Sequence, residues 1–487
     1  LAAAGYFALG TVVALAGCAA PALEAARAAP AVALKSGAGD VALNRLARAW
    51  PGLLLLAGGA LLTLAPPVGG LPLFAYIAIA LMLVGAIALM PRIAAALFHV
   101  LARGRFGRPV PGLALARLAN ASGQASIALG GVLASFSLMV AMAIMVASFR
   151  DSVDAWLVQV LPADVYVRTA SGGATAALGP GEQEAIASLP GVARVNFLRM
   201  RQVSLDAARP PVALLARPID PGRPGDIMPL TAPSLAVPAG AMPAWVSEAM
   251  LDLYGMRAGG WIELPVGGAT QRFFVAGVWR DYARQFGAIQ IRAEDYRRLT
   301  GDLEATDAAL WLQDGAHAGE VIGRLRALPF GARLELSEPG EIRAMSLAIF
   351  DRSFAVTYLL EAVAIAIGMS GVAATFSAQT LARAREFGML RHVGVTRGQV
   401  LGILAMEGLL LALLGVACGF ALGFAISLVL VFVVNPQSFH WTMELHLPWE
   451  LLGSVAAALV AASVAAALVS GRFALSGGPL RAVREDW

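Results

Sequence analysis

The chain has 487 residues, of which 58% are hydrophobic and only 14% are charged, and its formal net charge is +4. Soluble domains carry roughly a quarter charged residues, so the composition excludes a soluble protein and indicates an integral membrane protein. The basic excess lies in short segments beside apolar stretches, not in a patch interleaved with aromatic residues, so we expect no nucleic-acid partner.

Seven apolar stretches are long enough to cross a membrane, since a helical span needs about 20 residues. In chain order they are residues 1–20, 50–66, 71–90, 126–149, 353–378, 406–434 and 451–471. The second is the shortest and contains Gly58 and Gly59. We therefore predict an α-helical integral membrane protein with about seven transmembrane helices.

The charges of the connecting segments predict the membrane face of each one. Residues 91–125 contain five arginines and no acidic residue, which is typical of a cytoplasmic loop. Alternation then places three further segments in the cytoplasm, namely 21–49, 379–405 and 472–487. Together the four hold 16 basic and 5 acidic residues. No basic residue occurs in the two opposite loops, 67–70 and 435–450. Residues 150–350 are therefore expected outside the cytoplasm.

Both cysteines, Cys18 and Cys418, lie in apolar stretches, so we expect buried free thiols and no disulfide. Residues 15–18 also resemble a bacterial lipoprotein cleavage site, and lipidation at Cys18 would reverse the topology. The lack of a basic region ahead of this site argues against that alternative.

Residues 15–35 and the tail 472–487 share a pattern, because each ends a span and continues as a short amphipathic segment, with Pro30 aligned to Pro479. This pattern predicts an internal duplication. Since the chain also begins inside an apolar stretch at Leu1, we expect it to be a C-terminal fragment whose first half lies upstream.

Within residues 150–350 the pattern changes to alternating apolar and polar residues, which is typical of strands. Strands are expected at 164–168, 261–264, 272–275, 309–312 and 333–336. Helices are expected at 181–189, 247–255 and 317–328, with Ser247 as an N-cap. The Pro- and Gly-rich segment 207–243 is expected to be a long loop or a hinge between two lobes. This region is predicted to be an inserted mixed α/β extracytoplasmic domain.

Residues 383–400 form a polar island with four arginines and one glutamate between two highly apolar stretches. Lipid cannot solvate such a segment, so we expect it at the cytoplasmic face. Thr396 and Gln399 have the spacing of a capping box, which begins a helix just after Gly394. The island is therefore predicted to be a helix, a glycine turn and a second helix, placed where a cytoplasmic partner can bind.

Two acidic residues, Glu361 and Glu407, lie in or beside spans, where ionisable groups are costly and often functional. We expect Glu407 to be neutralised by Arg391 or Arg397 near the cytoplasmic end. Glu361 has no evident partner, so a role in substrate passage stays open beside a structural one.

Gly415, Gly419 and Gly423 are spaced four apart in the apolar stretch 406–434. They predict a smooth helix face that lets another helix approach closely. Such a face suits static helix packing or a subunit interface that slides.

No catalytic constellation is present in the sequence. Lys35, the single lysine, follows Leu34 and not the glycine of a P-loop, which excludes ATP binding by that motif. His440 and His446 flank Glu444 and form the one candidate metal site, although scattered ligands in a loop are commonly ordinary polar residues. We expect no metal, no cofactor and no enzymatic activity. The alternative from another class is a membrane-anchored enzyme with its active site in the extracytoplasmic region.

Segment 385–400, with the sequence REFGMLRHVGVTRGQV, and EGLL at 407–410 resemble the signature of FtsX-like ABC transporter permeases of the MacB and LolC/LolE group. The MacB-like periplasmic core domain is similar to three further segments, 247–250, 259–264 and 274–278. One permease unit is covered by about 115–487. The spans at 50–90 resemble the connector of duplicated ten-span permeases of the YbbP-like class.

The resemblance implies five regions. They are the end of a preceding permease unit at 1–35, a two-span connector at 36–112, a transmembrane helix opening the second unit at 113–149, the α/β domain at 150–350, and a permease domain at 351–487 with three spans and a coupling helix at 383–397.

A cytoplasmic ABC ATPase dimer of the LolD/MacB type is implied to dock on that coupling helix. The motif residues are Arg385, Glu386, Phe387, Gly388, Met389, Leu390, Arg391 and Gly394. Their three charged members are expected at the surface, and their three large apolar members are expected to pack inward.

The implied function is that of a permease subunit in a mechanotransmission-type ABC exporter of the bacterial inner membrane. ATPase-driven motion would reach the extracytoplasmic domain, which extracts or exports a hydrophobic or amphipathic substrate. Membrane lipids and a periplasmic partner or lipoprotein are the other implied contacts. The alternative with the same fold is an FtsX-like signal transducer that activates a periplasmic partner such as a cell-wall hydrolase.

Overall fold

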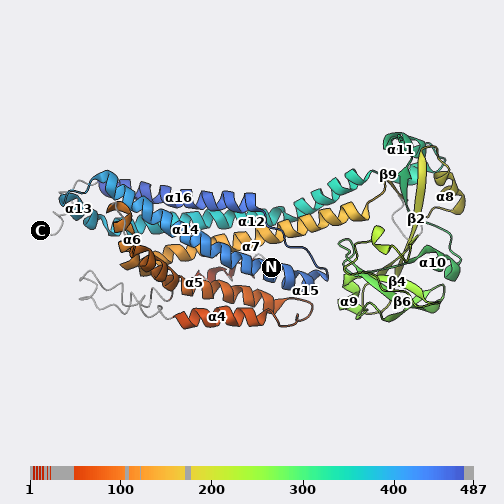
Figure 1. Ribbon diagram of the computed structural model, residues 1–487, viewed down its shortest axis with the longest axis horizontal. Helices are drawn as coiled ribbons and strands as arrows, with labels where there is room; N and C mark the ends of the chain where they lie inside the picture. The colour runs from red at the N-terminus through yellow and green to blue at the C-terminus, as the bar shows by residue number, and fades with distance from the viewer. Residues whose placement is uncertain are drawn as a thin grey trace.

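The computed structural model describes residues 49–104, 109–120, 122–169 and 177–476, with scattered positions between residues 4 and 22. Most of the expected span 1–20, and most of the repeat between 15–35 and 472–487, lie outside the described residues. Within the described part, a bundle of long helices lies at one end and an α/β domain at the other (Figure 1).

Ten helical segments make up the bundle and the stalk that leaves it. They are α4 (Ala49–Leu62), α5 (Leu73–Ala102), α6 (Pro109–Asn120), α7 (Ser122–Val160), α12 (Pro339–Ala382), α13 (Ala384–His392), α14 (Arg397–Val429), the π-helical turn (Leu430–Val434), α15 (Asn435–Phe439) and α16 (Trp449–Ser476). Among the described residues, five stretches are long and apolar enough to cross a membrane: Leu73–Ala102, Leu129–Val160, Pro339–Thr380, Arg397–Phe439 and Trp449–Leu475.

The predicted span at 50–66 is not confirmed. Its helix, α4, has 14 residues, and at about 1.5 Å per residue it reaches about 21 Å, less than the ~30 Å hydrocarbon layer. A Cβ atom built on Gly52 would lie 2.9 Å from the carbonyl oxygen of Gly85 on α5. The glycines therefore let α4 fold back closely against α5.

Both α7 and α12 are longer than the spans predicted at 126–149 and 353–378. Their 39 and 44 residues correspond to about 58 and 66 Å, roughly twice the hydrocarbon thickness. The two helices thus continue beyond the bilayer as a stalk, which the ion pairs Arg343–Asp154 and Arg150–Asp351 hold together. Both ends of the region predicted at 150–350 are therefore helical, and its strands begin at residue 165 and end at residue 337.

Nine strands form one mixed sheet in the order β5-β6-β4-β7-β3-β2-β8-β1-β9. They are β1 (Val165–Thr169), β2 (Val192–Val203), β3 (Val212–Arg217), β4 (Met242–Ser247), β5 (Trp261–Val266), β6 (Ala269–Trp279), β7 (Ala288–Arg292), β8 (Asp307–Leu312) and β9 (Leu334–Ser337). The helices of the domain are α8 (Pro180–Ala187), α9 (Glu248–Tyr254), α10 (Ala293–Thr300) and α11 (Ala318–Arg326). The predicted α/β class is confirmed, and every predicted strand and helix of this region has a counterpart.

The sheet comprises two lobes. A stalk lobe contains β1, β8, β9, α8 and α11 and joins the stalk directly, whereas an insert lobe contains β3 to β7, α9 and α10. Strand β2 belongs to both, because residues 192–198 pair with β8 and residues 199–203 pair with β3. Each lobe has its own hydrophobic core. The chain therefore crosses between the lobes twice, along β2 and in the return segment 301–306.

The loop predicted at 207–243 is wrong at residues 212–217, because β3 lies there and occupies the middle of the sheet. Five of the six residues of β3 are buried. A strand that is buried on both faces reads as a continuous apolar run and loses the period-two alternation. This is why the alternation pattern did not reveal β3, β4 or β7.

Candidate functional site

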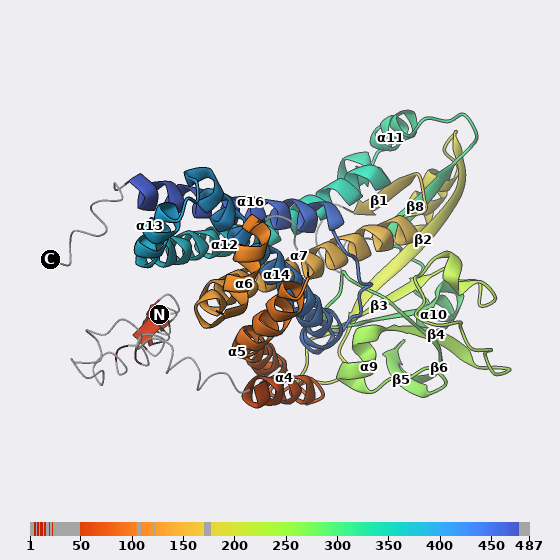
Figure 2. The same cartoon turned by 60° about the vertical axis from the view of Figure 1, so that its left-hand side comes forward.

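Helix α13 lies at the end of the bundle opposite the α/β domain, between α12 and α14 (Figures 1 and 2). The chain then turns at Gly394, whose φ of +99° is a conformation that glycine adopts readily. Thr396 Oγ1 accepts the Gln399 N–H at 3.2 Å, and Gln399 Oε1 accepts the Thr396 N–H at 2.9 Å. The capping box and the helix–turn–helix form predicted for 383–400 are confirmed.

Phe387 anchors α13 to the bundle. Its side chain is 1% exposed and packs with Val400, Leu404 and Leu475, which belong to α14 and α16. Leu390 packs against the same cluster. Because full burial of a phenylalanine contributes about 2 to 3 kcal/mol, we expect α13 to move together with α14 and α16.

The outward side of α13 is open and partly apolar. Met389 is 64% exposed, so the prediction that it packs inward is wrong. Val393 and Glu386 are also exposed, and they share a helix face with Met389 because residues three or four apart are neighbours. Arg391 is half-buried. The side chain of Arg385 lies outside the described part of the structure.

Four charged side chains form a cluster beside Phe387 that we call the Arg–Glu network. Arg117 of α6 contacts Glu386 at 2.6 Å and Glu407 at 3.4 Å. Arg383 contacts Glu407 at 3.2 Å and lies 3.8 Å from Glu386. Both guanidinium groups also lie over the Phe387 ring, 5.6 and 5.8 Å from its centre. The network balances two positive against two negative charges and joins α6, α13 and α14.

This network corrects the partners predicted for Glu407. The Glu407 side chain is 4% exposed and is neutralised by Arg117 and Arg383 instead of Arg391 or Arg397. A buried charge needs such partners, because removing an ion from water costs several kcal/mol. Arg117 lies 290 positions away along the chain, so no local signal in the sequence pointed to it.

Glu361 lies half-buried on α12, away from this network. No ion pair or hydrogen bond of its side chain is found among the residues that the structure describes. Its role in substrate passage stays a prediction.

Gly415, Gly419 and Gly423 lie on the side of α14 that meets α7. A Cβ atom on Gly415 would lie 2.8 Å from the Val132 side chain, and one on Gly423 would lie 2.6 Å from the carbonyl oxygen of Ser137. Side chains at these positions would therefore push the two helices apart.

The candidate metal ligands have other partners. His440 Nδ1 lies 3.3 Å from Asp252, and His446 Nε2 lies 3.1 Å from Asp151. Glu444 pairs with an arginine of the insert lobe. No group of three or more His, Cys, Asp or Glu residues is placed to hold a metal ion in the described ranges.

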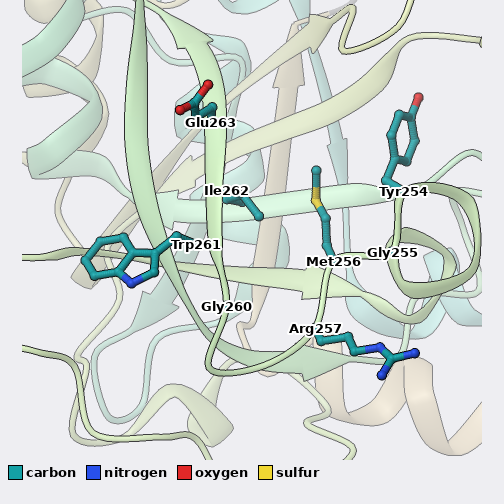
Figure 3. Close-up of a pocket in the computed structure, with 8 residues that line it drawn as sticks. All are labelled: Tyr254, Gly255, Met256, Arg257, Gly260, Trp261, Ile262 and Glu263. Atoms are coloured by element: carbon teal, nitrogen blue, oxygen red, sulfur yellow. The ribbon is translucent and has the colours of Figure 1, made fainter.

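An open cavity of about 330 Å³ lies on the insert lobe beside β5. Tyr254, Arg257 and Trp261 line it, and their side chains point in different directions (Figure 3). Arg257 and Glu263, two of its eight described lining residues, form no ion pair with each other. The lining residues described for this cavity do not converge on a reacting centre, so it lends no support to the enzyme alternative.

Residues 358–479 match the family model of the FtsX-like permease C-terminal domain. The chain is 29% identical over 385 residues to an uncharacterized ABC transporter permease protein of Mycobacterium tuberculosis. This alignment covers 76% of the chain and 44% of the relative. The chain thus spans less than half the length of that relative.

The solved structures that are similar to the chain include two domains of ABC transporter proteins. The periplasmic region of MacB from Actinobacillus actinomycetemcomitans has a TM-score of 0.27 and 10% identity, and the match covers 38% of this chain and 94% of that chain. The extracellular domain of the noncanonic ABC-type transporter YknZ from Gram-positive bacteria has a TM-score of 0.26 and 10% identity, with 36% and 99% covered.

The family match includes segment 385–400, which contains most of α13 and the glycine turn, and residues 407–410, and the resemblance rests on these two motifs. The chain is therefore a multi-pass membrane protein that carries an FtsX-like permease C-terminal domain and is homologous to an ABC transporter permease.

Proposed function

We propose that the chain is the permease subunit of a mechanotransmission-type ABC exporter in a bacterial inner membrane. Its homology to an ABC transporter permease supports this function. The basic segments around α13 favour a cytoplasmic location for that end of the bundle. The α/β domain at the opposite end (Figure 1) is then outside the cytoplasm.

A cytoplasmic ABC ATPase dimer docks on the outward face of α13 and supplies nucleotide hydrolysis. The observation that carries this proposal is the exposure of Met389 on a helix whose other face is held by Phe387. Exposed Val393 enlarges the apolar surface, and Glu386 and Arg391 lie beside it. An apolar centre with a charged rim is the usual composition of a protein–protein interface.

The ATPase moves the bundle through packing contacts. Phe387 links α13 to α14 and α16, and the Arg–Glu network links it to α6. Packed interiors are stiff, so a displacement of α13 shifts the cytoplasmic ends of these helices together. The stalk of α7 and α12 carries the motion to the α/β domain, which extracts or exports a hydrophobic or amphipathic substrate from the outer face of the membrane.

Met389→Asp tests the docking face. The charge is expected to abolish co-purification of the ATPase while the permease still inserts into the membrane, because Met389 is 64% exposed. Met345→Asp is the matched control, since Met345 is 67% exposed on the stalk and is expected to retain the ATPase.

Unchanged ATPase binding and hydrolysis in Met389→Asp would sink the docking assignment. Release of a lipid or lipoprotein by the wild-type complex supports export. Capture of a cell-wall hydrolase without substrate release would instead indicate the signal-transducer alternative.

A further inference from the structure

Helix α14 reaches from the proposed docking site to the α/β domain. With the π-helical turn and α15 it forms one helical body, Arg397–Phe439, of 43 residues, or about 65 Å at 1.5 Å per residue. One end follows α13 and its capping box. The other end leads into residues 440–448, which we call the outer loop and which connect α15 to α16 (Figure 1).

The first half of the outer loop is hydrogen-bonded to the insert lobe. Thr442 donates its N–H and its hydroxyl to the two carboxylate oxygens of Glu248, at 2.9 and 2.7 Å. The Tyr282 hydroxyl donates to the Thr442 carbonyl oxygen at 2.7 Å. Burial raises the pKa of Tyr282 to about 12, so this hydroxyl keeps its proton at physiological pH. His440 lies 3.3 Å from Asp252.

Aromatic packing and an ion pair complete the contact. Trp441 is 9% exposed, stacks on Phe149 of α7 at 5.9 Å and meets Tyr282 edge-on at 5.7 Å. Arg280 of the insert lobe contacts Glu444 at 3.0 Å. Aromatic pairs of this kind contribute about 0.5–1.5 kcal/mol each beyond the area that they bury, so the loop is held by several contacts that reinforce one another.

The second half of the outer loop is tied to α7. Ser152 Oγ accepts the Glu444 N–H at 3.0 Å, and Ser148 Oγ accepts the His446 N–H at 2.9 Å. The outer loop therefore fastens the insert lobe to the outer ends of α7 and α14 together.

The two lobes are thus attached to the bundle in different ways. The stalk lobe continues directly into α12 after β9, whereas the insert lobe, which has no covalent connection to a span of its own, meets the outer loop. Helix α13 lies between α12 and α14, so a displacement of α13 acts on both. At the lobe boundary, buried Arg199 of β2 contacts Asp302 at 2.9 Å and Glu304 at 2.8 Å in the return segment.

The insert lobe is connected covalently to the stalk lobe by β2 and by residues 301–306. We propose that the outer loop is a third, non-covalent link, which transmits movement of α14 to the insert lobe. Displacement of α13 then changes the angle between the two lobes about β2. This inference rests on the proposed docking of an ATPase at α13. It assigns Thr442, Tyr282 and Glu248 as positioning residues, since each acts through the contact between the outer loop and the insert lobe.

Distances between spin labels on the two lobes test this link. Cysteines for the spin labels are placed at Glu335 of the stalk lobe and Thr270 of the insert lobe, which are both exposed. The distance between the two labels is measured in the full permease–ATPase complex in lipid, with and without a non-hydrolysable nucleotide. The wild-type complex is expected to show a nucleotide-dependent shift. Tyr282→Phe with Thr442→Val removes two hydroxyls from the loop contact, keeps the aromatic ring, and is expected to lose the shift while still binding the ATPase.

Tyr254→Phe with Thr231→Val makes the same two changes in the insert lobe away from the outer loop, and it is expected to keep the shift. A charge exchange gives a second variant. Arg280→Glu alone is expected to lose the shift, and adding Glu444→Arg is expected to restore it, which a folding defect would not do.

A full shift in the Tyr282/Thr442 variant would overturn the link. So would a wild-type complex in which the nucleotide changes the labelling of a cysteine at Met389 but not the distance between the lobes, and that result would leave the proposed docking intact. Absence of any ATPase binding at α13 would overturn the proposed function itself, and the link with it.

Discussion

At the scale of single residues, buried charge decides which contacts in this protein are obligatory. Glu407 needs both Arg117 and Arg383, because its carboxylate is almost wholly buried. Arg117 also contacts exposed Glu386, so its guanidinium group joins Glu407 of α14 to Glu386 of α13. Replacing either arginine by a neutral residue leaves the buried Glu407 carboxylate with fewer hydrogen bonds and less opposite charge beside it.

Arg117→Met is expected to weaken the contact between α6 and α14. Loss of charged hydrogen bonds to a buried carboxylate costs about 2 kcal/mol, and the long apolar side chain preserves much of the packing. A lower thermal unfolding midpoint of the purified permease would show this. Arg103→Met removes an exposed basic residue at the end of α5 and is expected to leave the midpoint unchanged; equal midpoints for both variants would contradict the network's role.

Glu248→Gln probes the pH dependence of the junction between the insert lobe and the outer loop. Burial raises the pKa of Glu248 above its usual 4.5, and the hydrogen bonds from Thr442 oppose this shift only in part. The folded protein then holds this proton more tightly than the unfolded chain. The contribution of Glu248 to the free energy of unfolding is therefore fully present below pH 4.5 and is lost as the pH rises through the raised pKa.

Glutamine does not titrate, so the unfolding temperature of Glu248→Gln relative to wild type is expected to rise from acidic to neutral pH. Asp252, Arg280 and His440 also face this site, but they are present in both the wild type and the Glu248→Gln variant, so their effects are common to the two. Glu263→Gln, an exposed carboxyl of β5, controls for loss of one negative charge. A difference that stays constant or falls with pH would refute the assignment.

At the scale of elements, close helix packing lets α14 act as one body. Small residues at its contact with α7 bring the backbones together, and the capping box begins the helix at a defined residue. The π-helical turn, where α14 passes into α15, interrupts its regular hydrogen bonding near the outer loop, and such turns often occur at functional sites. Arg397–Phe439 is thus a continuous helical path along which the proposed displacement of α13 would reach the outer loop.

Gly423→Leu is expected to disrupt the packing of α14 on α7. The added side chain would meet Ser137 and Val140 within van der Waals distance, and overpacking of this kind costs about 1–3 kcal/mol. Gly371→Leu on α12 is the matched control, because nothing lies within 4 Å of a Cβ atom there. Thermal unfolding in detergent is expected to separate the two variants, and equal stability would contradict the close packing.

At the scale of the whole molecule, the bundle separates the two surfaces to which the proposed function assigns different roles. The proposed docking face on α13 and the α/β domain lie at opposite ends (Figure 1), so any coupling between them must pass along the helices. Five described helices are of spanning length, and the charges of their connections predict the cytoplasmic end.

Cysteine labelling tests this orientation. In a background without the native cysteines, a cysteine at Glu335 is expected to react with a membrane-impermeant maleimide in cells whose outer envelope has been permeabilised. A cysteine at Met389 is expected to react only after the inner membrane is disrupted, because the arginine-rich side faces the cytoplasm. Reaction in the opposite order would invert the topology and remove the proposed docking site from the ATPase.

The sequence by itself determined the features that depend on neighbouring residues. Apolar length and flanking arginines marked the membrane class and most of the spans, and alternation marked β1, β5, β6, β8 and β9. The spacing of Thr396 and Gln399 defined where α14 begins. Each of these signals depends on residues that are close together in the sequence, so the local sequence pattern is enough to predict it.

Only the tertiary structure decided the contacts between distant segments. It placed Arg117 beside Glu407, exposed Met389, put β3 at the centre of the sheet and joined the outer loop to the insert lobe. The physical reason is that burial and charge pairing depend on what packs against a residue, and here the partners come from far along the chain. The segment 383–400 was recognisable as a site from its sequence, but the surface that it presents was decided by the helices around it.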